Sequence, residues 1–252
     1  MARPVKKPAY RAPALEKGIA ILELLAEARR PLTVADIAGS MRRSRPEIYR
    51  MLVVLESLNY LLRTEDGSYD LSGRMFEVAS RHAPRRHIVA AARAAMQMLA
   101  ERTQQSCHLM VNSGDHMVCV AREESPAAIG FAVQVGFRPA LPQSTSGRLH
   151  FAFQEESRQA LICKRLGAAA SRELRADAAR IRRQGYAAEP SRLTTGIEDL
   201  CAPVFAHDGL PAACLTIPFV SHRLFPVTRR QALKMLLEAA SEITDTLRTG
   251  TR

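Results

Sequence analysis

From Pro31 to Leu71 the chain reads PLTVADIAGSMRRSRPEIYRMLVVLESLNYLLRTEDGSYDL, and this stretch decides the fold of its first part. Two short helical patterns are separated by a few residues, and a hairpin pattern follows them. This order is typical of a winged helix-turn-helix, which places its second helix in the major groove of DNA.

The two helices of this stretch have separate start signals. Thr33 is expected to cap the first helix, and Asp36 faces its positive end. Ser44-x-x-Glu47 predicts a capping box at the start of the second helix, where Pro46 suits the first turn. Apolar residues at helical spacing predict the buried faces of the two helices: Val34, Ile37, Ala38 and Met41, then Ile48, Met51, Leu52, Leu55 and Leu58.

The other face of the second helix is basic. Arginine can bind phosphate or the O6/N7 edge of guanine, so a cluster at this position favours DNA contact over a merely solvated face. Glu47 can complete its capping box or accept a hydrogen bond from cytosine, and we prefer the capping role. Arg29 and Arg30 are interpreted as ordinary surface residues. The predicted DNA-contacting residues are Arg42, Arg43, Ser44, Arg45, Glu47, Tyr49 and Arg50.

A hairpin follows the second helix directly, which favours a wing over a generic hairpin. Residues 60–64 and 68–71 are its predicted strands, and Asp66-Gly67 is a strong turn signal because glycine tolerates a positive φ. Glu65, Asp66 and Asp70 make this wing acidic. We therefore do not expect its tip to be the main phosphate contact.

The length, charge and cysteine content of the chain limit the classes of protein to which it can belong. The 252 residues can form two modest domains or one large one, and a net charge of +11 suits a polyanionic partner. No stretch approaches the roughly 20 apolar residues of a membrane-spanning helix, so no membrane partner is expected. Five widely spaced cysteines fit a reducing cytoplasm better than a disulfide framework. The basic, proline-rich residues 1–13 are expected to be a disordered arm, with or without a role on DNA.

The remainder of the chain mixes helices and strands, which predicts an α+β protein. Helix 14–28 is expected to bury Leu15, Ile19, Leu22, Leu25 and Ala26, and a break is expected near residues 80–86. Arg172, Arg175, Arg180, Arg182 and Arg183 are interpreted as a solvated helix face. The other predicted helices are 73–80, 88–103, 146–153, 155–166, 171–184 and one from Thr228 to about 247; the predicted strands are 107–111, 117–121, 129–135, 200–206 and 212–219.

Several segments in this order resemble the IclR family of bacterial transcription regulators across nearly the full length of the chain. They are LEKGIAILELLAEA at Leu15, SRPEIYRMLVVLESLNYL at Ser44, VGFRPALPQSTSGRLHFAF at Val135, IRRQGYAAE at Ile181 and GIEDLCAPVFAHDGLPAACLTI at Gly196. Each segment alone is a weak signal, whereas their order and spacing together are specific.

The resemblance implies an N-terminal winged helix-turn-helix domain over 14–72, linker and signalling helices over 73–104, and a C-terminal GAF-like α/β effector-binding domain over 105–252. It implies a homodimer or homotetramer on a palindromic operator in double-stranded DNA, and a small organic or aromatic acid as effector. RNA polymerase is a further candidate partner, and the choice between repressor and activator stays open. No cofactor or metal is expected.

The segment Ser144-Thr145-Ser146-Gly147-Arg148 leads from a loop into a helix, whose free N–H groups can bind a carboxylate; an ordinary N-cap is the alternative. Leu141 and Phe131 are wall candidates that can equally be plain core. Relatives often carry a cysteine or small polar residue where Asp199 stands, and a serine where Pro218 stands. The predicted effector site comprises Thr145, Ser146, Gly147 and Arg148 of this segment and, by position in the family pattern, Glu189, Ile197, Asp199 and Thr216.

Two other classes of protein remain as alternatives. A DNA-binding protein without a ligand would not need the long α+β half. An enzyme is suggested only by Cys107-His108 and Asp115-His116, but adjacent residues on a strand point to opposite faces and the spacing matches no standard zinc site. We therefore expect no enzymatic activity, and we interpret the scattered histidines as satisfied or exposed: His82, His87, His150, His207 and His222.

Overall fold

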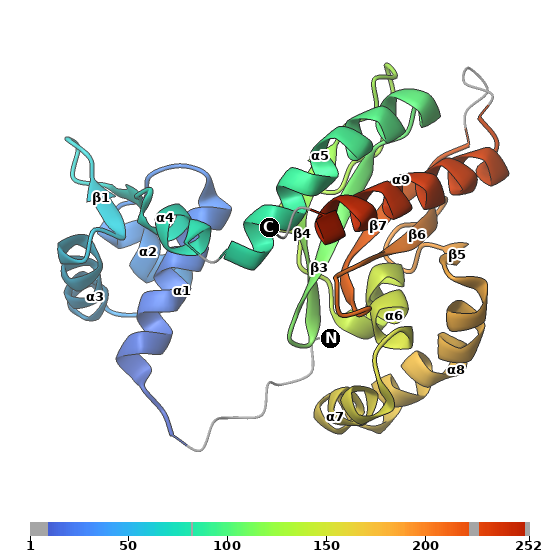
Figure 1. Ribbon diagram of the computed structural model, residues 1–252. Helices are drawn as coiled ribbons and strands as arrows, with labels where there is room; N and C mark the ends of the chain where they lie inside the picture. Colours follow the sequence, from blue (N-terminus) through green and yellow to red (C-terminus); the bar gives the residue numbers. More distant parts are fainter. Residues whose placement is uncertain (1–9, 82, 222–226, 250–252) are drawn as a thin grey trace. The chain divides into compact units, whose positions relative to one another are not determined.

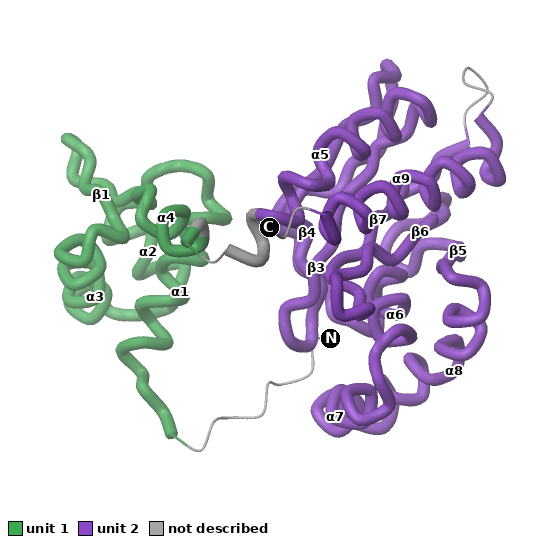
Figure 2. Tube along the Cα trace, viewed as in Figure 1, with its two compact units in different colours: residues 1–83 green, residues 84–252 purple. Residues whose placement is uncertain are grey.

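The computed structural model describes residues 10–81, 83–221 and 227–249, and it divides into two compact units between Ala83 and Pro84 (Figures 1 and 2). Most of the predicted N-terminal arm, residues 1–9, lies outside the described residues. Unit 1 comprises α1 Pro13–Ala28, α2 Val34–Met41, α3 Arg45–Ser57, β1 Leu61–Arg63, β2 Tyr69–Leu71 and α4 Arg74–Ser80.

The elements of unit 1 form where the local signals placed them. Thr33 and Asp36 bond reciprocally at the start of α2, so the predicted cap is a complete capping box. β1 and β2 pair antiparallel around Gly67, which has a φ of 79°. Helices α1, α2 and α3 and the hairpin share one core, which contains Ile21, Leu25, Leu32, Ile37, Ala38, Ile48, Leu52, Leu61 and Tyr69.

Two predictions about buried faces in unit 1 are wrong. Leu15 and Ile19 of α1 are 64% and 48% exposed, and Ala26 is exposed too, because the helix buries the neighbouring stripe through Gly18 and Ile21 instead. Leu58 is 56% exposed because it is the C-cap residue of α3 and lies beyond its last turn.

Unit 2 is built on an antiparallel sheet of order β4-β3-β7-β6-β5. Its capping box at Thr228 and Gln231 is present as predicted, and Gly185 ends α8 in the left-handed conformation. The elements are α5 Ala83–Thr103, β3 Cys107–Ser113, β4 His116–Glu123, the 3-10 helix η1 Leu141–Gln143, α6 Thr145–Ala152, α7 Glu156–Leu166, α8 Ala168–Gln184, β5 Ala187–Pro190, β6 Glu198–Phe205, β7 Pro211–Phe219 and α9 Arg229–Thr249.

The two faces of this sheet carry different layers (Figure 1). Leu109, Leu200 and Leu215 alternate onto the face that packs with α5 and α9. Met110, Cys201 and Cys214 point to the opposite face, where they pack with Leu149 and Ala152 of α6. This second face is the one on which the candidate effector site lies.

The predicted strand 129–135 is wrong. The segment is irregular, and Gly136, with a φ of 89°, follows it. The chain instead reaches the edge of β4 just afterwards, where Cys119 N–H donates to Phe137 O and Met117 N–H donates to Pro139 O, both at 3.0 Å. Strand β5 has no counterpart in the sequence prediction because it spans only four residues and ends in proline.

Candidate functional sites

The first candidate site is the outer face of α3 and the turn before it. Arg42 adopts a left-handed φ of 52°, and its N–H closes α2 by bonding to Ala38 O and Gly39 O. Arg43, Arg45 and Arg50 are exposed, and Tyr49 is 48% exposed. Exposed guanidinium groups and a phenol therefore lie along α3 and the turn before it, and Arg50 lies opposite the buried Ile48 and Leu52, as a helix that enters a groove requires.

The predicted capping role of Glu47 is wrong. Ser44 is the N-cap residue of α3, but its side chain makes no capping hydrogen bond. The Glu47 carboxylate is instead paired with the ammonium group of Lys17 on α1, and this contact lowers the pKa of Glu47. Glu47 pairs with a lysine thirty residues upstream in place of the backbone N–H at the start of its own helix. The motif Ser44-x-x-Glu47 alone could not predict this distant partner.

The wing carries its acidic groups in an ordered turn. Asp66 accepts hydrogen bonds from Thr64 Oγ1 and from Ser68 N–H, at 2.5 and 3.3 Å. The Thr64 bond, with those from Ser68, lowers the pKa of Asp66, which keeps the tip of the hairpin negatively charged. This charge opposes phosphate contact at the tip.

The second candidate site begins at the N-terminus of α6. Ser144 caps this helix by accepting from Gly147 N–H at 3.1 Å. Thr145 then donates its hydroxyl toward two acidic side chains of the sheet, Asp199 Oδ2 at 3.0 Å and Glu189 Oε1 at 3.4 Å. The start of α6 is thus linked directly to β5 and β6.

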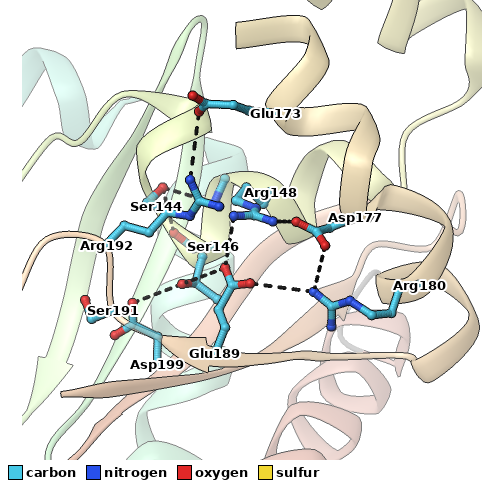
Figure 3. A network of polar contacts seen from close by, with 12 residues as sticks. Ser144, Ser146, Arg148, Glu173, Asp177, Arg180, Glu189, Ser191, Arg192 and Asp199 are labelled. Atoms are coloured by element: carbon cyan, nitrogen blue, oxygen red, sulfur yellow. Dashed lines mark hydrogen bonds and ion pairs between the residues drawn. The ribbon is translucent and has the colours of Figure 1, made fainter. Parts of the chain in front are cut away.

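Arg148 lies at the centre of an ion network (Figure 3). Its side chain is 1% exposed, forms an ion pair with Asp177 of α8, and approaches Glu189 at 3.6 Å. Arg180 reaches the same two carboxylates, at 3.3 and 3.6 Å. Within the described chain, Arg148 Nε and Nη1 have no hydrogen-bond acceptor, and burial lowers the pKa of Arg148.

Asp199 is the most unusual acid of this network. Burial raises its pKa, whereas the hydrogen bonds from Thr145 and Ser191 act in the opposite direction. Glu189 lies opposite it in the β5–β6 register and adds like charge. Such a carboxyl group is suited to accept a hydrogen bond from a ligand or to carry a proton itself.

The structure brings together four of the eight residues predicted for this site: Thr145, Arg148, Glu189 and Asp199. Two more lie where α6 packs on the sheet: the Ser146 carbonyl oxygen of α6 accepts the Cys214 thiol at 3.3 Å, and Thr216 Oγ1 of β7 donates to Cys201 Sγ at 3.2 Å. Asp177 and Arg180 belong to the same network but escaped the sequence prediction. Their only local signal is the three-residue spacing of an acid and a base on α8.

The other two predicted residues have different surroundings. Ile197 lies in the turn before β6, where its carbonyl accepts from Ser191 N–H at 2.9 Å. Gly147 packs its backbone directly on η1, which leaves no room for a side chain. Leu141 is plain core, because it packs with Phe151 of α6 and Leu174 of α8.

The basic run of α8 is only partly a solvated face. Arg172, Arg175 and Arg183 are exposed as predicted, whereas Arg180 belongs to the network. Arg182 donates to the carbonyl oxygens of Ala152 and Gln154, at 2.9 and 2.8 Å. It therefore ties α8 to the end of α6.

The features that suggested an enzyme do not assemble. Cys107 faces the core with α5, and burial raises its pKa to about 12, so the thiol is not ionised at neutral pH. Within the described ranges, no group of three or more His, Cys, Asp and Glu residues could hold a metal ion. The helices of the same ranges include none that is long and apolar enough to cross a membrane.

Family models match both units of the chain. Residues 81–245 match the bacterial transcriptional regulator IclR C-terminal domain, and residues 14–65 match the IclR helix-turn-helix domain. The chain belongs to the IclR family. It is therefore a transcriptional regulator with a helix-turn-helix DNA-binding domain, and the resemblance seen in the sequence is confirmed.

Curated relatives of this IclR-family chain are also transcriptional regulators. HTH-type transcriptional regulator KdgR of Dickeya chrysanthemi is 23% identical over 238 residues, which cover 91% of this chain and 78% of the relative. The Pca regulon regulatory protein of Pseudomonas putida is 24% identical over 243 residues, which cover 91% and 82%.

Solved structures of the family share the fold. The IclR protein of Thermotoga maritima is 25% identical, with a TM-score of 0.68 over 93% of this chain and 98% of that one. An IclR homologue from Microbacterium hydrocarbonoxydans, solved in complex with 4-hydroxybenzoate, is 21% identical, with a TM-score of 0.77 over 94% and 99%. The mixed α+β architecture expected from the sequence is thereby confirmed.

Proposed function

We propose that this IclR-family regulator binds a small carboxylic acid at the N-terminus of α6 and that this binding controls its affinity for a promoter. The observation that carries the proposal is Arg148, a buried cation whose Nε and Nη1 find no hydrogen-bond acceptor in the described chain. A helix N-terminus attracts anions through its free N–H groups, and this one adds the hydroxyls of Thr145 and Ser146.

Three acidic side chains of the network limit the negative charge that a ligand can carry. Asp177 and Glu189 already face Arg148, so a ligand carboxylate competes with them for the guanidinium group. Protonation of Asp199, which its raised pKa favours, lowers the repulsion of an incoming anion. A monocarboxylate is therefore a better fit than a ligand of higher charge.

We propose that the output is made by α3 on a palindromic operator. Glu47 does not cap α3, since it pairs with Lys17. The residues proposed to contact DNA are Arg42, Arg43, Ser44, Arg45, Tyr49 and Arg50. A dimer would present two such helices to half-sites one helical turn (~34 Å) apart, or a multiple of it. The effector acts only through different affinities for the two arrangements of the dimer.

A ligand screen and a DNA-binding assay test this proposal in sequence. The full-length protein is heated with benzoate, 4-hydroxybenzoate, pyruvate or lactate, because a ligand of the folded state must raise the melting temperature. An acid that does so is then added to a gel-shift titration with promoter DNA at fixed salt. A shift in operator affinity supports the proposal. If no acid changes either quantity, the alternative of a DNA-binding protein without a ligand is favoured.

A further inference from the structure

His108 is a buried polar residue that the network around Arg148 leaves out. Its side chain is 7% exposed, and its Nδ1 atom is buried without a hydrogen-bond partner among the described residues. Buried polar atoms in native proteins are nearly always paired, so an unpaired one calls for a role. His150 Nδ1 is likewise buried without a partner among the described residues, so the sequence interpretation of His150 as satisfied or exposed is wrong.

The strand register places His108 on the same face as the candidate effector site. Its neighbours Cys107 and Leu109 pack with α5 and α9, so the side chain between them points to the opposite face, toward the side of α6. His108 lies opposite Thr216 in the β3–β7 register, and Thr216 lies opposite Cys201 in the β6–β7 register. One row of polar side chains therefore crosses the centre of the sheet.

This row runs beside the acids at the start of α6. Asp199 lies two residues before Cys201 on β6, on the same face, and it accepts the hydroxyl of Thr145. Cys214, two residues before Thr216, donates to Ser146 O. The imidazole and the helix N-terminus thus approach the same part of the sheet from two directions.

The side chains of this row favour an uncharged polar group on a ligand over a charged one. Burial lowers the pKa of His108 to about 4, so its ring is neutral at physiological pH and offers a hydrogen bond without a charge. Asp199 and Glu189 disfavour a second carboxylate nearby. A hydroxyl group can both donate and accept, so it can bond to a neutral imidazole and to the Thr216 hydroxyl.

We propose that His108 recognises a hydroxyl group of the effector, which makes the effector a hydroxylated monocarboxylic acid. This inference rests on the proposed function, in which the carboxylate binds at the N-terminus of α6. His108 then forms the other end of the site and determines which acids the protein distinguishes.

Acids that differ by one hydroxyl remote from the carboxylate test this role by calorimetry on the full-length protein: 4-hydroxybenzoate is compared with benzoate. Terephthalate replaces the hydroxyl by a second carboxylate. The wild type is expected to prefer the hydroxylated member of the pair by about tenfold or more and to bind terephthalate worse than 4-hydroxybenzoate. His108→Leu should abolish the preference and leave affinity for the deoxy acid nearly unchanged. His108→Asn, whose amide can reach the place of Nδ1, should restore part of it.

A second measurement needs no ligand. Removing an unpaired buried nitrogen should leave the melting temperature of the free H108L protein at or above that of the wild type. Cys107→Ala is the matched control, because it alters the same strand on the other face and should leave the hydroxyl preference intact.

The outcomes separate this inference from the proposed function. Failure of all these acids to bind the wild type overturns the proposed effector class, and this inference with it. Binding by the wild type with no hydroxyl preference, or a preference that survives in H108L, overturns the role of His108 alone. A clear loss of stability in free H108L also overturns it, because Nδ1 would then be making a structural bond.

Discussion

A Cβ atom placed on Gly147 would lie 2.1 Å from the carbonyl oxygen of Leu141. The first turn of α6 therefore packs on the backbone of η1 with no side chain between them. We predict that Gly147→Ala destabilises unit 2 by about 3 kcal/mol or more, because the backbone atoms that it meets cannot move aside as a flexible side chain would. Chemical denaturation monitored by circular dichroism measures this loss.

Gly39→Ala is the matched control for this prediction. Gly39 lies in α2, and a Cβ atom there meets nothing within 4 Å. Replacing it should stabilise unit 1 by about 0.5–1 kcal/mol through helix propensity alone. Equal effects of the two substitutions would show that the close approach at Leu141 does not matter.

We predict that Arg50→Ala weakens operator binding by about 1–3 kcal/mol and leaves effector binding unchanged. Arg50 is exposed on the face of α3 opposite the buried Ile48 and Leu52, so its removal costs contacts with DNA and none with the core. Gel-shift titrations at fixed salt measure the loss. Arg30→Ala removes an exposed charge outside this face and should have a clearly smaller effect; equal operator affinity of wild type and R50A would exclude α3 as assigned.

We predict that Glu47→Gln strengthens DNA binding without relaxing its sequence preference. The Glu47 carboxylate is paired with Lys17, so the substitution removes a negative charge beside the DNA while leaving base contacts in place. Stability should change by no more than about 1 kcal/mol, since the pair is partly exposed. Binding to operator and to scrambled DNA should improve together; a selective loss on the operator would show that Glu47 reads a base.

We predict that Thr216→Val weakens the response to the effector and leaves operator affinity in its absence unchanged. Thr216 is 3% exposed and lies on the α6 face of the sheet, so the change keeps the shape of the side chain and removes its hydroxyl. Effector titrations followed by gel shift measure the response. Thr246→Val, at an exposed position of α9, is the control. An unaltered effector affinity in T216V would remove Thr216 from the site.

We predict that stability falls as the pH drops from about 6.5 to about 4. Burial lowers the pKa of His108 and of His150 to about 4 from a usual 6.5. Within this window the unfolded chain binds protons that the folded chain does not, and this difference can cost about 3 kcal/mol per histidine. Asp199, with its raised pKa, acts in the opposite direction.

Urea titrations at pH 7, 5.5 and 4.5 check this prediction. Comparison of the wild type with His108→Leu isolates one histidine from the other titrating groups. The variant should lose less stability on acidification than the wild type. Parallel pH profiles would mean that His108 binds its proton equally well in both states.

The sequence predicted the elements of unit 1 well because their signals are local. Thr33 and Asp36 bond within one turn, and Gly67 meets the demand of one hairpin. The errors arose where a distant element decided the outcome. Glu47 forms an ion pair with Lys17 instead of capping the backbone of its own helix. The apolar spacing of α1 does not determine which side of the helix is buried, and the neighbouring helices decide it.

The candidate effector site shows the same division. The start of α6 was visible as a run of small and hydroxylated residues, and Ser144 caps it. The partners of Arg148 were not visible, because Asp177 and Glu189 come from α8 and β5 and meet only in the folded unit. The place of His108 beside this site could not be predicted either, because it depends on the strand register that pairs His108 with Thr216 far along the chain.

The pairing of β3 with β7 also bears on the order in which the protein is made. The strand that carries His108 can pair with β7 only after Thr216, roughly a hundred residues later, has been synthesised. The contacts of unit 1 join segments that are much nearer in sequence. Chains leave the ribosome from the N-terminus, so unit 1 can fold while the sheet of unit 2 is still open. A chain interrupted before β7 would keep the part that reads DNA and lack the part proposed to make that binding depend on an effector.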